Sequence, residues 1–254
     1  MRDLKMLQDK TILITGASSG IGASAVKLFA EVGAKLVITA RRADRLEEVR
    51  KSVGADADRV LIVPGDVNDP HCAKGLVEAA KDYFGGLDGA FNNAGILGDL
   101  GPVEDMRQEA WNTVLNTNLT SCFLAAKYQV PALRENGGGA IVFTSTFVGH
   151  TVGMPGMAAY AASKAGLIGL TQCLAAECGP ANIRVNALLP GGTKTDMAGD
   201  DPDYHEIVKG MHALKRMAEP EEIARAAMFL LSDAGSFVTG SAMLCDGGNS
   251  ISKT

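Results

Sequence analysis

Short apolar runs alternate with longer segments in which apolar residues recur at helical spacing, along almost the whole chain. The apolar runs predict seven β-strands, at 10–15, 36–39, 60–63, 87–92, 140–144, 183–188 and 241–245. The longer segments predict helices at 23–32, 44–51, 70–84, within 108–134, at about 158–178 and at 220–231. Strands that are apolar at nearly every position are typical of a parallel sheet with helices on both faces.

This alternation runs through the chain without a linker, a repeat or a break in composition. We therefore expect residues 1–254 to form a single α/β domain, with a doubly wound, Rossmann-like, parallel seven-stranded sheet. Two segments, 96–105 and 191–217, fit the alternation poorly and carry several Gly and Pro residues. Each follows a strand at the sheet edge where such folds bind ligands. Each is therefore predicted to be a lid, with a solvated surface loop as the alternative.

Composition narrows the class of protein. Hydrophobic residues make up 46% of the 254 residues, which is enough to bury a full core and argues against a disordered chain. With 24 Lys+Arg against 29 Asp+Glu the net charge is −5, and no basic block favours nucleic acid or an anionic membrane as a partner. No apolar run reaches the roughly 20 residues of a membrane span, and the first ten residues carry scattered charges, unlike a signal peptide. These features predict a cytoplasmic protein.

The cysteines and histidines show no metal-ligand spacing. The five cysteines lie far apart, without a C-x-x-C pair, at positions 72, 122, 173, 178 and 245. We interpret them as small buried hydrophobic residues, and no metal site is predicted.

A glycine cluster follows the first predicted strand. Gly16, Gly20 and Gly22 lie between that strand and the next helix. Glycine tolerates positive φ and allows close approach of a pyrophosphate, to which the helix N-terminus offers free N–H groups. Such glycines also serve plain turns, but the strand–glycine–helix order favours a phosphate-binding loop.

A second motif pairs Tyr160 with Lys164. On a helix these residues lie at i and i+4, on one face. A tyrosine hydroxyl titrates near pH 10, so acid–base work near pH 7 needs its pKa lowered by roughly 3 units, to which a nearby ammonium contributes. Taken alone, the pair also fits an amphipathic helix surface.

These motifs occur with others in one order along the chain. The order is TGASSGIG at 15–22, NNAG at 92–95, Asn118, TST at 144–146, YAASK at 160–164 and PGG at 190–192. In this order and spacing the sequence resembles the short-chain dehydrogenase/reductase family, in its compact branch of roughly 250 residues. The resemblance extends from the first strand to DGG at 246–248. It implies a nicotinamide-dependent oxidoreductase that acts on a carbonyl or a secondary alcohol.

The resemblance also implies where the cofactor binds. The glycine loop matches the segment that holds the pyrophosphate, and Asp66 with Val67 matches the pair beside the adenine. Segment 92–95 matches one that steadies the sheet and contacts the adenosine ribose, and segment 190–195 matches one that fixes the nicotinamide. The cofactor-binding residues expected in all are Gly16, Ser18, Ser19, Gly20, Ile21, Gly22, Arg41, Arg42, Asp66, Val67, Asn93, Ala94, Gly95, Tyr160, Lys164, Pro190, Gly191, Thr193 and Thr195.

The same resemblance assigns catalytic roles. Tyr160 matches the general acid/base, and Lys164 the residue that binds the nicotinamide ribose and lowers the tyrosine pKa. Asn118 matches a helix asparagine that holds a proton-relay water. Ser121 departs from the pattern, because many relatives have glycine in N-x-x-G.

The hydroxyl that should bind the substrate oxygen is Thr146 or Ser145. Relatives usually place a serine three residues before a glycine and thirteen before the tyrosine. Aligning Gly149 puts Thr146 in that position, with one extra residue before Tyr160. Successive residues at a strand end point to opposite faces, so only one of the two hydroxyls can face the carbonyl easily. We favour Thr146.

Arg41 and Arg42 follow the second strand, where an NAD-preferring relative usually carries Asp for the ribose 2′-OH. A guanidinium at this place favours a 2′-phosphate, so NADP (NADPH) is expected and NAD is the second choice. Alternatively, the two arginines simply begin a solvated helix.

Substrate and assembly are less defined. Candidate pocket residues, which serve equally well as core, are Leu97, Phe147, His150, Met154, Met157 and Met197. A 3-oxoacyl thioester reductase acting on an acyl-carrier protein is a rival interpretation, disfavoured by the acidic run 200–203 because such a carrier is itself acidic. A non-catalytic cofactor-binding regulator is a third. A small-molecule substrate and a homotetramer, or at least a dimer, are expected from the family.

Overall fold

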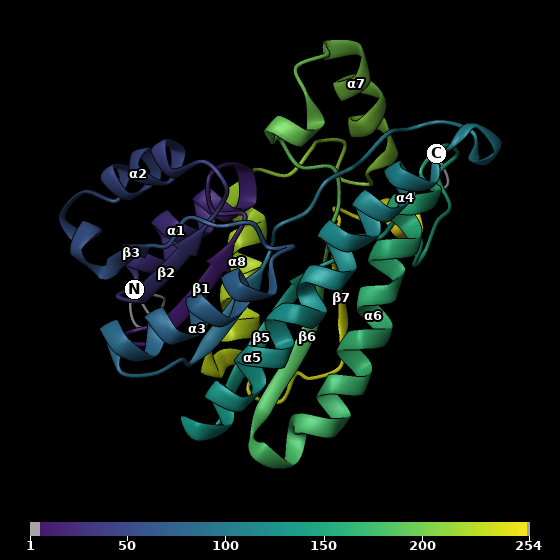
Figure 1. Ribbon diagram of the computed structural model, residues 1–254. Helices are drawn as coiled ribbons and strands as arrows, with labels where there is room; N and C mark the ends of the chain where they lie inside the picture. Colours follow the sequence, from purple (N-terminus) through teal and green to yellow (C-terminus); the bar gives the residue numbers. More distant parts are fainter. Residues whose placement is uncertain (1–5, 253–254) are drawn as a thin grey trace.

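The computed structural model describes residues 6–252, and its seven strands form one sheet (Figure 1). The strands are β1 (Thr11–Thr15), β2 (Lys35–Thr39), β3 (Val60–Ile62), β4 (Gly89–Asn92), β5 (Gly139–Thr144), β6 (Ile183–Pro190) and β7 (Ala242–Cys245). Their order is β3-β2-β1-β4-β5-β6-β7, and every neighbouring pair is parallel. The predicted fold class is confirmed. The order reverses between β1 and β4, so the loops after these strands diverge and leave room for a ligand.

The helices differ from the prediction in two places. They are α1 (Gly20–Glu31), α2 (Ala43–Ser52), α3 (Pro70–Phe84), α4 (Gln108–Leu115), α5 (Ser121–Glu135), α6 (Ala158–Cys178), α7 (Pro202–Met211) and α8 (Pro220–Leu231). The long helix expected within 108–134 is divided into α4 and α5 by a π-helical turn, Asn116–Thr120. Helix α7 lies inside the segment 191–217, in which no helix was predicted.

Helix α7 forms because its first residues satisfy a helix N-terminus. The Asp201 carboxylate accepts hydrogen bonds from the main-chain N–H groups of Asp203 (3.0 Å) and Tyr204 (3.5 Å). Pro202 occupies the first helical position, where its missing N–H costs nothing. The acidic run is thus partly a helix cap, and the Asp-Pro pair was the sequence signal for it.

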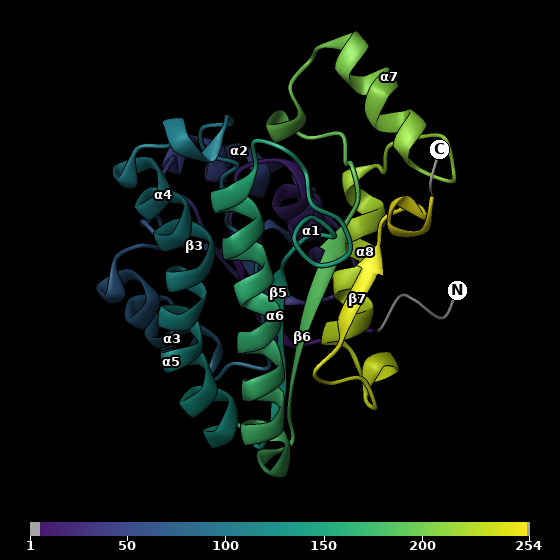
Figure 2. The same cartoon turned by 90° about the vertical axis from the view of Figure 1, so that its right-hand side faces the viewer.

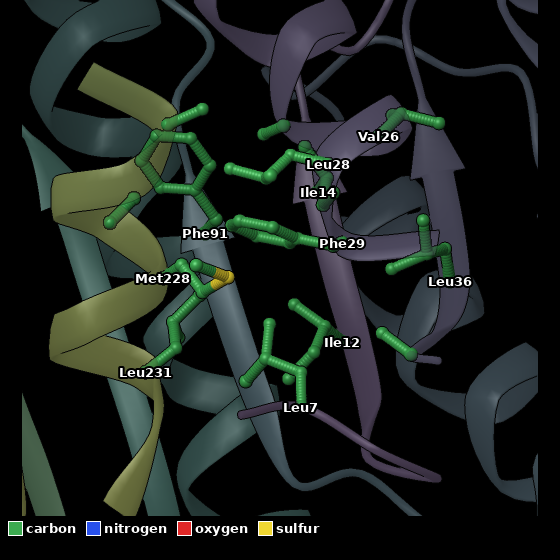
Figure 3. Close-up of a cluster of buried hydrophobic side chains, with 14 of the residues drawn as sticks. Leu7, Ile12, Ile14, Val26, Leu28, Phe29, Leu36, Phe91, Met228 and Leu231 are labelled. Atoms are coloured by element: carbon green, nitrogen blue, oxygen red, sulfur yellow. The ribbon is translucent and has the colours of Figure 1, made fainter. Parts of the chain in front are cut away.

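The two faces of the sheet follow the alternation of side chains along each strand. Ile12 and Ile14 pack with residues of α1, α2 and α8, whereas Leu13 packs against α3, α5 and α6. Figure 3 shows the first of these layers, where the rings of Phe29 and Phe91 lie 6.4 Å apart between centroids. The sheet is therefore a rigid platform, buried on both faces, for the loops at the ends of its strands.

Helix α7 lies outside both layers. It stands beyond the carboxyl ends of the strands, at the top of both views in Figures 1 and 2. Four of its large apolar or aromatic side chains line a cleft at that end of the sheet, those of Tyr204, Ile207, Val208 and Met211. The position matches the predicted lid.

The cysteines differ in burial more than expected. Cys122 and Cys178 are buried, Cys72 and Cys245 are half-buried, and Cys173 on α6 is exposed. All five are free thiols. The interpretation as buried hydrophobic residues therefore holds fully for two of them.

Candidate active site

A cleft of about 930 Å³ lies at the carboxyl ends of β1, β4, β5 and β6. Nearly all of the predicted cofactor and catalytic residues line it. The exceptions are Gly22, which lies within α1, and Asn118, which is fully buried behind the cleft wall. Residues far apart in the sequence thus meet in one depression.

The glycine loop leaves no room for side chains. Gly16 and Gly20 have φ values of +66° and +52°, which favour glycine. A Cβ on Gly22 would lie 2.1 Å from the carbonyl oxygen of Gly16, and one on Gly16 would lie 2.8 Å from Cα of Ala94. The first turn of α1 carries no acidic residue, and the Ser19 side chain makes no capping hydrogen bond. The N–H groups there are available to an anion, so the loop fits the pyrophosphate of a dinucleotide.

The segment after β4 is held against this loop. The Thr15 hydroxyl accepts hydrogen bonds from the main-chain N–H groups of Asn93 and Ala94, both at 3.0 Å. The buried amides of Asn92 and Gln129 bond each other reciprocally, at 2.9 Å. The wall beside the glycine loop is therefore fixed by side chains whose polar groups are satisfied.

Asn118 lies in the π-helical turn and uses its amide for structure. Its Oδ1 accepts from the N–H of Ile96 (2.8 Å), while its Nδ2 donates to the carbonyl of Ile96 (2.9 Å) and to the hydroxyl of Ser163 (3.0 Å). The side chain ties the loop after β4 to α6. These contacts commit its amide to positioning the loop, and the expected proton-relay role stays a prediction.

Lys164 is buried, one helical turn after Tyr160 on α6. Its Nζ donates to the carbonyl of Thr144 at 2.6 Å and lies 5.9 Å from the centroid of the Tyr160 ring. Burial lowers the pKa of Lys164 to about 8, since the charged form is desolvated. The i, i+4 spacing therefore does place both residues on one face of α6, toward the cleft.

Tyr160 is half-buried, and burial raises the pKa of its hydroxyl to about 12. A hydrogen bond with Thr146 acts in the opposite direction. In this structure the phenol is thus stabilised as the protonated form, which differs from the lowered pKa expected from the sequence. The reason is that desolvation penalises the phenolate more than its neighbours favour it.

The two candidate hydroxyls have different partners. Ser145 is buried, and its Oγ donates to the main-chain carbonyl of Lys164 at 2.7 Å. The Thr146 hydroxyl lies close enough to Tyr160 to lower the pKa of the phenol, and it accepts a hydrogen bond from the main-chain N–H of Val148 at 3.4 Å. The geometry therefore supports Thr146 as the hydroxyl that faces the reacting group.

The end of the cleft beside β2 carries the predicted charges. Arg41 and Arg42 follow β2, are both exposed and line the cleft, as do Asp66 and Val67. Within residues 6–252, neither guanidinium forms an ion pair. Both arginines are thus available to an anionic ligand.

Segment 190–195 closes the other side. Thr195 lies against the glycine loop, because a Cβ on Gly20 would come within 3.0 Å of its Cγ2. Thr193 forms a parallel bridge with Ala218, and the N–H of Ala218 donates to the carbonyl of Gly192 at 2.9 Å. Beside this bridge, Lys194 and Glu219 form an ion pair. The two ends of the segment that carries α7 are therefore held together.

The far end of the cleft is apolar. Five of the six candidate pocket residues, Leu97, Phe147, Met154, Met157 and Met197, line it. The prediction for His150 was wrong, because this residue is exposed and lies outside the cleft lining. The sequence reading missed the contribution of α7, which comprises Tyr204, Ile207, Val208 and Met211. The helical spacing of these four residues was the signal that could have found them.

Residues 6–252 contain neither a metal-binding cluster nor a membrane-spanning helix. No group of three His, Cys, Asp or Glu side chains there could hold a metal ion. Among the helices of this same range, none combines the length and the apolar character that a bilayer crossing needs.

Comparisons with known proteins agree with this geometry. A family model described as Enoyl-(Acyl carrier protein) reductase matches residues 16–250. The chain is 38% identical over 239 residues to a cyclohexanol dehydrogenase of Acinetobacter sp., which covers 94% of each protein. It superposes on a short-chain type dehydrogenase/reductase from Mycobacterium marinum with a TM-score of 0.93, at 35% identity and 99% coverage of both chains. On the 3-ketoacyl-(acyl-carrier-protein) reductase of Brucella melitensis complexed with NADH, the TM-score is 0.91 at 33% identity, covering 96% of this chain and 100% of the other.

The matched family model spans most of the sequence, and the relatives match along nearly their full lengths. These relatives are named dehydrogenases and reductases, and the glycine loop and the Tyr160–Lys164 pair meet in the one cleft. The chain belongs to the short-chain dehydrogenase/reductase family of oxidoreductases.

Proposed function

We propose that this protein is an NADP-dependent oxidoreductase that interconverts a carbonyl compound and a secondary alcohol, with Tyr160 as general acid/base. One observation carries the proposal. The hydroxyls of Tyr160 and Thr146 lie near each other in a cleft whose one end is a glycine loop fit for a pyrophosphate and whose other end is apolar. A substrate held at the apolar end would meet both hydroxyls.

The chain's own groups then do the following. Tyr160, whose pKa of about 12 keeps it protonated near neutral pH, donates its proton to the substrate oxygen during reduction. The Thr146 hydroxyl donates a hydrogen bond to the same oxygen as negative charge develops. The Lys164 ammonium, 5.9 Å from the ring, favours the phenolate that is left behind. The nicotinamide, when bound, supplies the hydride for reduction or accepts it in alcohol oxidation.

The preference for NADP over NAD rests on Arg41 and Arg42. Both guanidinium groups line the cleft beside Asp66 and Val67 and are not engaged in ion pairs within residues 6–252. A charge-assisted bond from a guanidinium to a 2′-phosphate contributes about 1.5–3 kcal/mol. The NADH complex of the Brucella reductase shows that relatives of this fold also take the other dinucleotide, so NAD is the second choice.

The substrate we propose is small, uncharged and largely apolar. The cleft-lining residues contributed by 96–100, 147–157 and 197–211 include no charged side chain. The Met and Leu side chains there suit an alicyclic or aliphatic substrate, in line with the cyclohexanol dehydrogenase relative.

A 3-oxoacyl thioester on an acyl-carrier protein is the second candidate, since the Brucella relative bears that name. An acidic carrier would approach past the exposed Asp200, Asp201 and Asp203 at the start of the lid, which disfavours it. A non-catalytic regulator is a weaker alternative, because Tyr160, Lys164 and Thr146 are all present and in mutual contact or close by.

The decisive experiment follows NADPH and NADH consumption with cyclohexanones, diketones and 3-oxoacyl thioesters. We expect turnover of cyclohexanones, with a higher kcat/KM for NADPH than for NADH. Tyr160→Phe should lower kcat by at least about 10²-fold while the Kd for NADPH stays within a few-fold. Tight NADPH binding without turnover of any substrate would favour the regulator, and an equal or better kcat/KM with NADH would reverse the cofactor preference.

Assembly and location are further proposals. We propose a homotetramer, on family grounds. A cytoplasmic location, and the lack of nucleic-acid or membrane partners, stay predictions from composition and charge.

A further inference from the structure

His212 is a buried histidine outside the cleft lining that no motif singled out. It follows the last residue of α7 and is only 2% exposed. Its Nε2 lies 3.0 Å from the main-chain nitrogen of Gly192, and its Nδ1 lies 2.6 Å from the carbonyl oxygen of Val208. Because an amide N–H can only donate, Nε2 is the acceptor, so Nδ1 carries the proton and donates to Val208. Both ring nitrogens are used, and the neutral ring is held in one tautomer.

The two glycines after β6 provide the space for this ring. A Cβ on Gly191 would lie 2.7 Å from Nε2 of His212, and a Cβ on Gly192 would lie 2.9 Å from its Cε1. The same Cβ on Gly192 would meet Cγ1 of Val208 at 2.3 Å. The imidazole is therefore stacked directly on the bare main chain of the segment, a contact that side chains at 191 and 192 would prevent.

This segment forms a wall of the cleft. Gly191, Gly192 and Thr193 all line it, and Thr195 contacts the glycine loop. His212, directly after α7, contacts this segment but does not itself line the cleft. It thus joins the lid, which borders the apolar end of the cleft, to the segment expected to hold the nicotinamide.

We propose that His212 is a positioning residue for the nicotinamide half of the dinucleotide, acting by fixing the main chain of Gly192. The proposal rests on the proposed function, because it needs the segment 190–195 to contact that half. Without the bond, the Gly192 N–H loses its acceptor and the segment samples other conformations, so dinucleotide binding must order it first.

The chain allows a matched set of variants. His212→Leu fills the space but accepts no hydrogen bond. His212→Asn can still donate to Val208 but is too short to replace Nε2, whereas His212→Gln carries a carbonyl oxygen that can reach Gly192. His205 is a half-buried histidine of α7, bonded to the carbonyl of Gly199, and His205→Leu is the control.

The experiment measures Kd by titration for two ligands, NADPH and adenosine 2′,5′-bisphosphate, which lacks the nicotinamide half. We expect His212→Leu and His212→Asn to weaken NADPH binding by about threefold to tenfold, the range for loss of one hydrogen bond. Binding of the bisphosphate should stay within twofold. His212→Gln and His205→Leu should bind both ligands like the wild type.

Other outcomes overturn the inference. Equal weakening of both ligands, or no weakening of NADPH despite a lower Tm, would make His212 a purely structural residue. If His212→Leu does not fold, the Asn and Gln variants give the same comparison, and equal Kd values for these two would refute the role of Nε2. Wild-type protein that binds neither ligand would instead refute the proposed function.

Discussion

At the scale of single residues, the site depends on which hydrogen bond each hydroxyl makes. Ser145 and Thr146 are neighbours in the sequence, and alternation at the end of β5 sends them to different partners. The sequence could reduce the choice to two residues but not decide it, since the acceptor for Ser145 is a carbonyl of α6, nineteen positions away. Similarly, the sequence could not show that burial outweighs the Thr146 hydroxyl in setting the pKa of Tyr160.

The two hydroxyls should respond differently to substitution. Thr146→Val keeps the shape and removes the donor, so kcat should fall by about 10²-fold or more. Ser145→Ala removes only a bond to the helix backbone, so kcat should change by less than about tenfold, with a lower Tm. Steady-state kinetics of both variants decide the question, and the reverse ranking would assign the role to Ser145.

Lys164 should lower the stability of the free protein near neutral pH. Its pKa is about 8 in the folded protein and 10.5 in the unfolded chain, so the unfolded state binds more protons between these values and stability rises with pH across that window. Below pH 8 the full cost of the buried charge is present. Lys164→Met should therefore raise the Tm at pH 7 by several degrees, and the gain should shrink toward pH 10.5.

Thermal unfolding of the free protein at several pH values tests this expectation. Lys27→Met, at an exposed position of α1, is the control and should leave the Tm unchanged at every pH. A Lys164→Met variant that is less stable than the wild type at pH 7 would show that the bond to Thr144 outweighs the desolvation of the ammonium.

At the scale of elements, most strands and helices were predicted because their apolar pattern matches their burial. β1 is buried at all five positions, and the buried residues of α3 recur at helical spacing. The π-helical turn at Asn116–Thr120 was not predictable, because nothing in its composition distinguishes it from an ordinary helix. Helix α7 was missed because its glycine- and acid-rich surroundings resemble a loop, although Asp201-Pro202 is a recognisable start.

The cap of α7 provides a test of the lid. Asp201→Ala removes two hydrogen bonds from a ten-residue helix, at a cost of about 0.5–2 kcal/mol. Because α7 lies outside the sheet layers, we expect the Tm to change little while proteolysis within 196–211 becomes faster and the KM for the carbonyl substrate rises. Asp200→Ala, at a neighbouring exposed acid, should leave all three measurements unchanged.

At the scale of the whole molecule, α4, α5 and α6 present a broad outer surface (Figure 2). Phe123 on α5 is 52% exposed, and the exposed residues of α6 include the small Ala162, Gly169 and Ala176. Small residues let helices of two subunits approach closely, and an exposed phenylalanine favours burial in such a contact. Only the fold shows that these small residues face outward.

We expect sedimentation to show a tetramer of the 26.4 kDa chain at micromolar concentration. Phe123→Asp should shift it to smaller species, because a carboxylate in an apolar helix contact is poorly solvated. Tyr83→Asp, on α3 and 63% exposed, should leave the mass unchanged. A wild-type monomer would refute the tetramer, and a tetramer that survives Phe123→Asp would place the interface elsewhere.

The bridge that holds the two ends of the lid segment together has a consequence for how this protein can evolve. Because Thr193 and Ala218 lie side by side, the two ends of the segment between them meet at one point, and this segment can vary in length at little entropic cost. Substrate range can therefore diverge by exchange of a self-contained module while the sheet and the glycine loop stay as they are. The bond from His212 to Gly192 limits that freedom, since a replacement segment must end in a residue able to accept the same N–H.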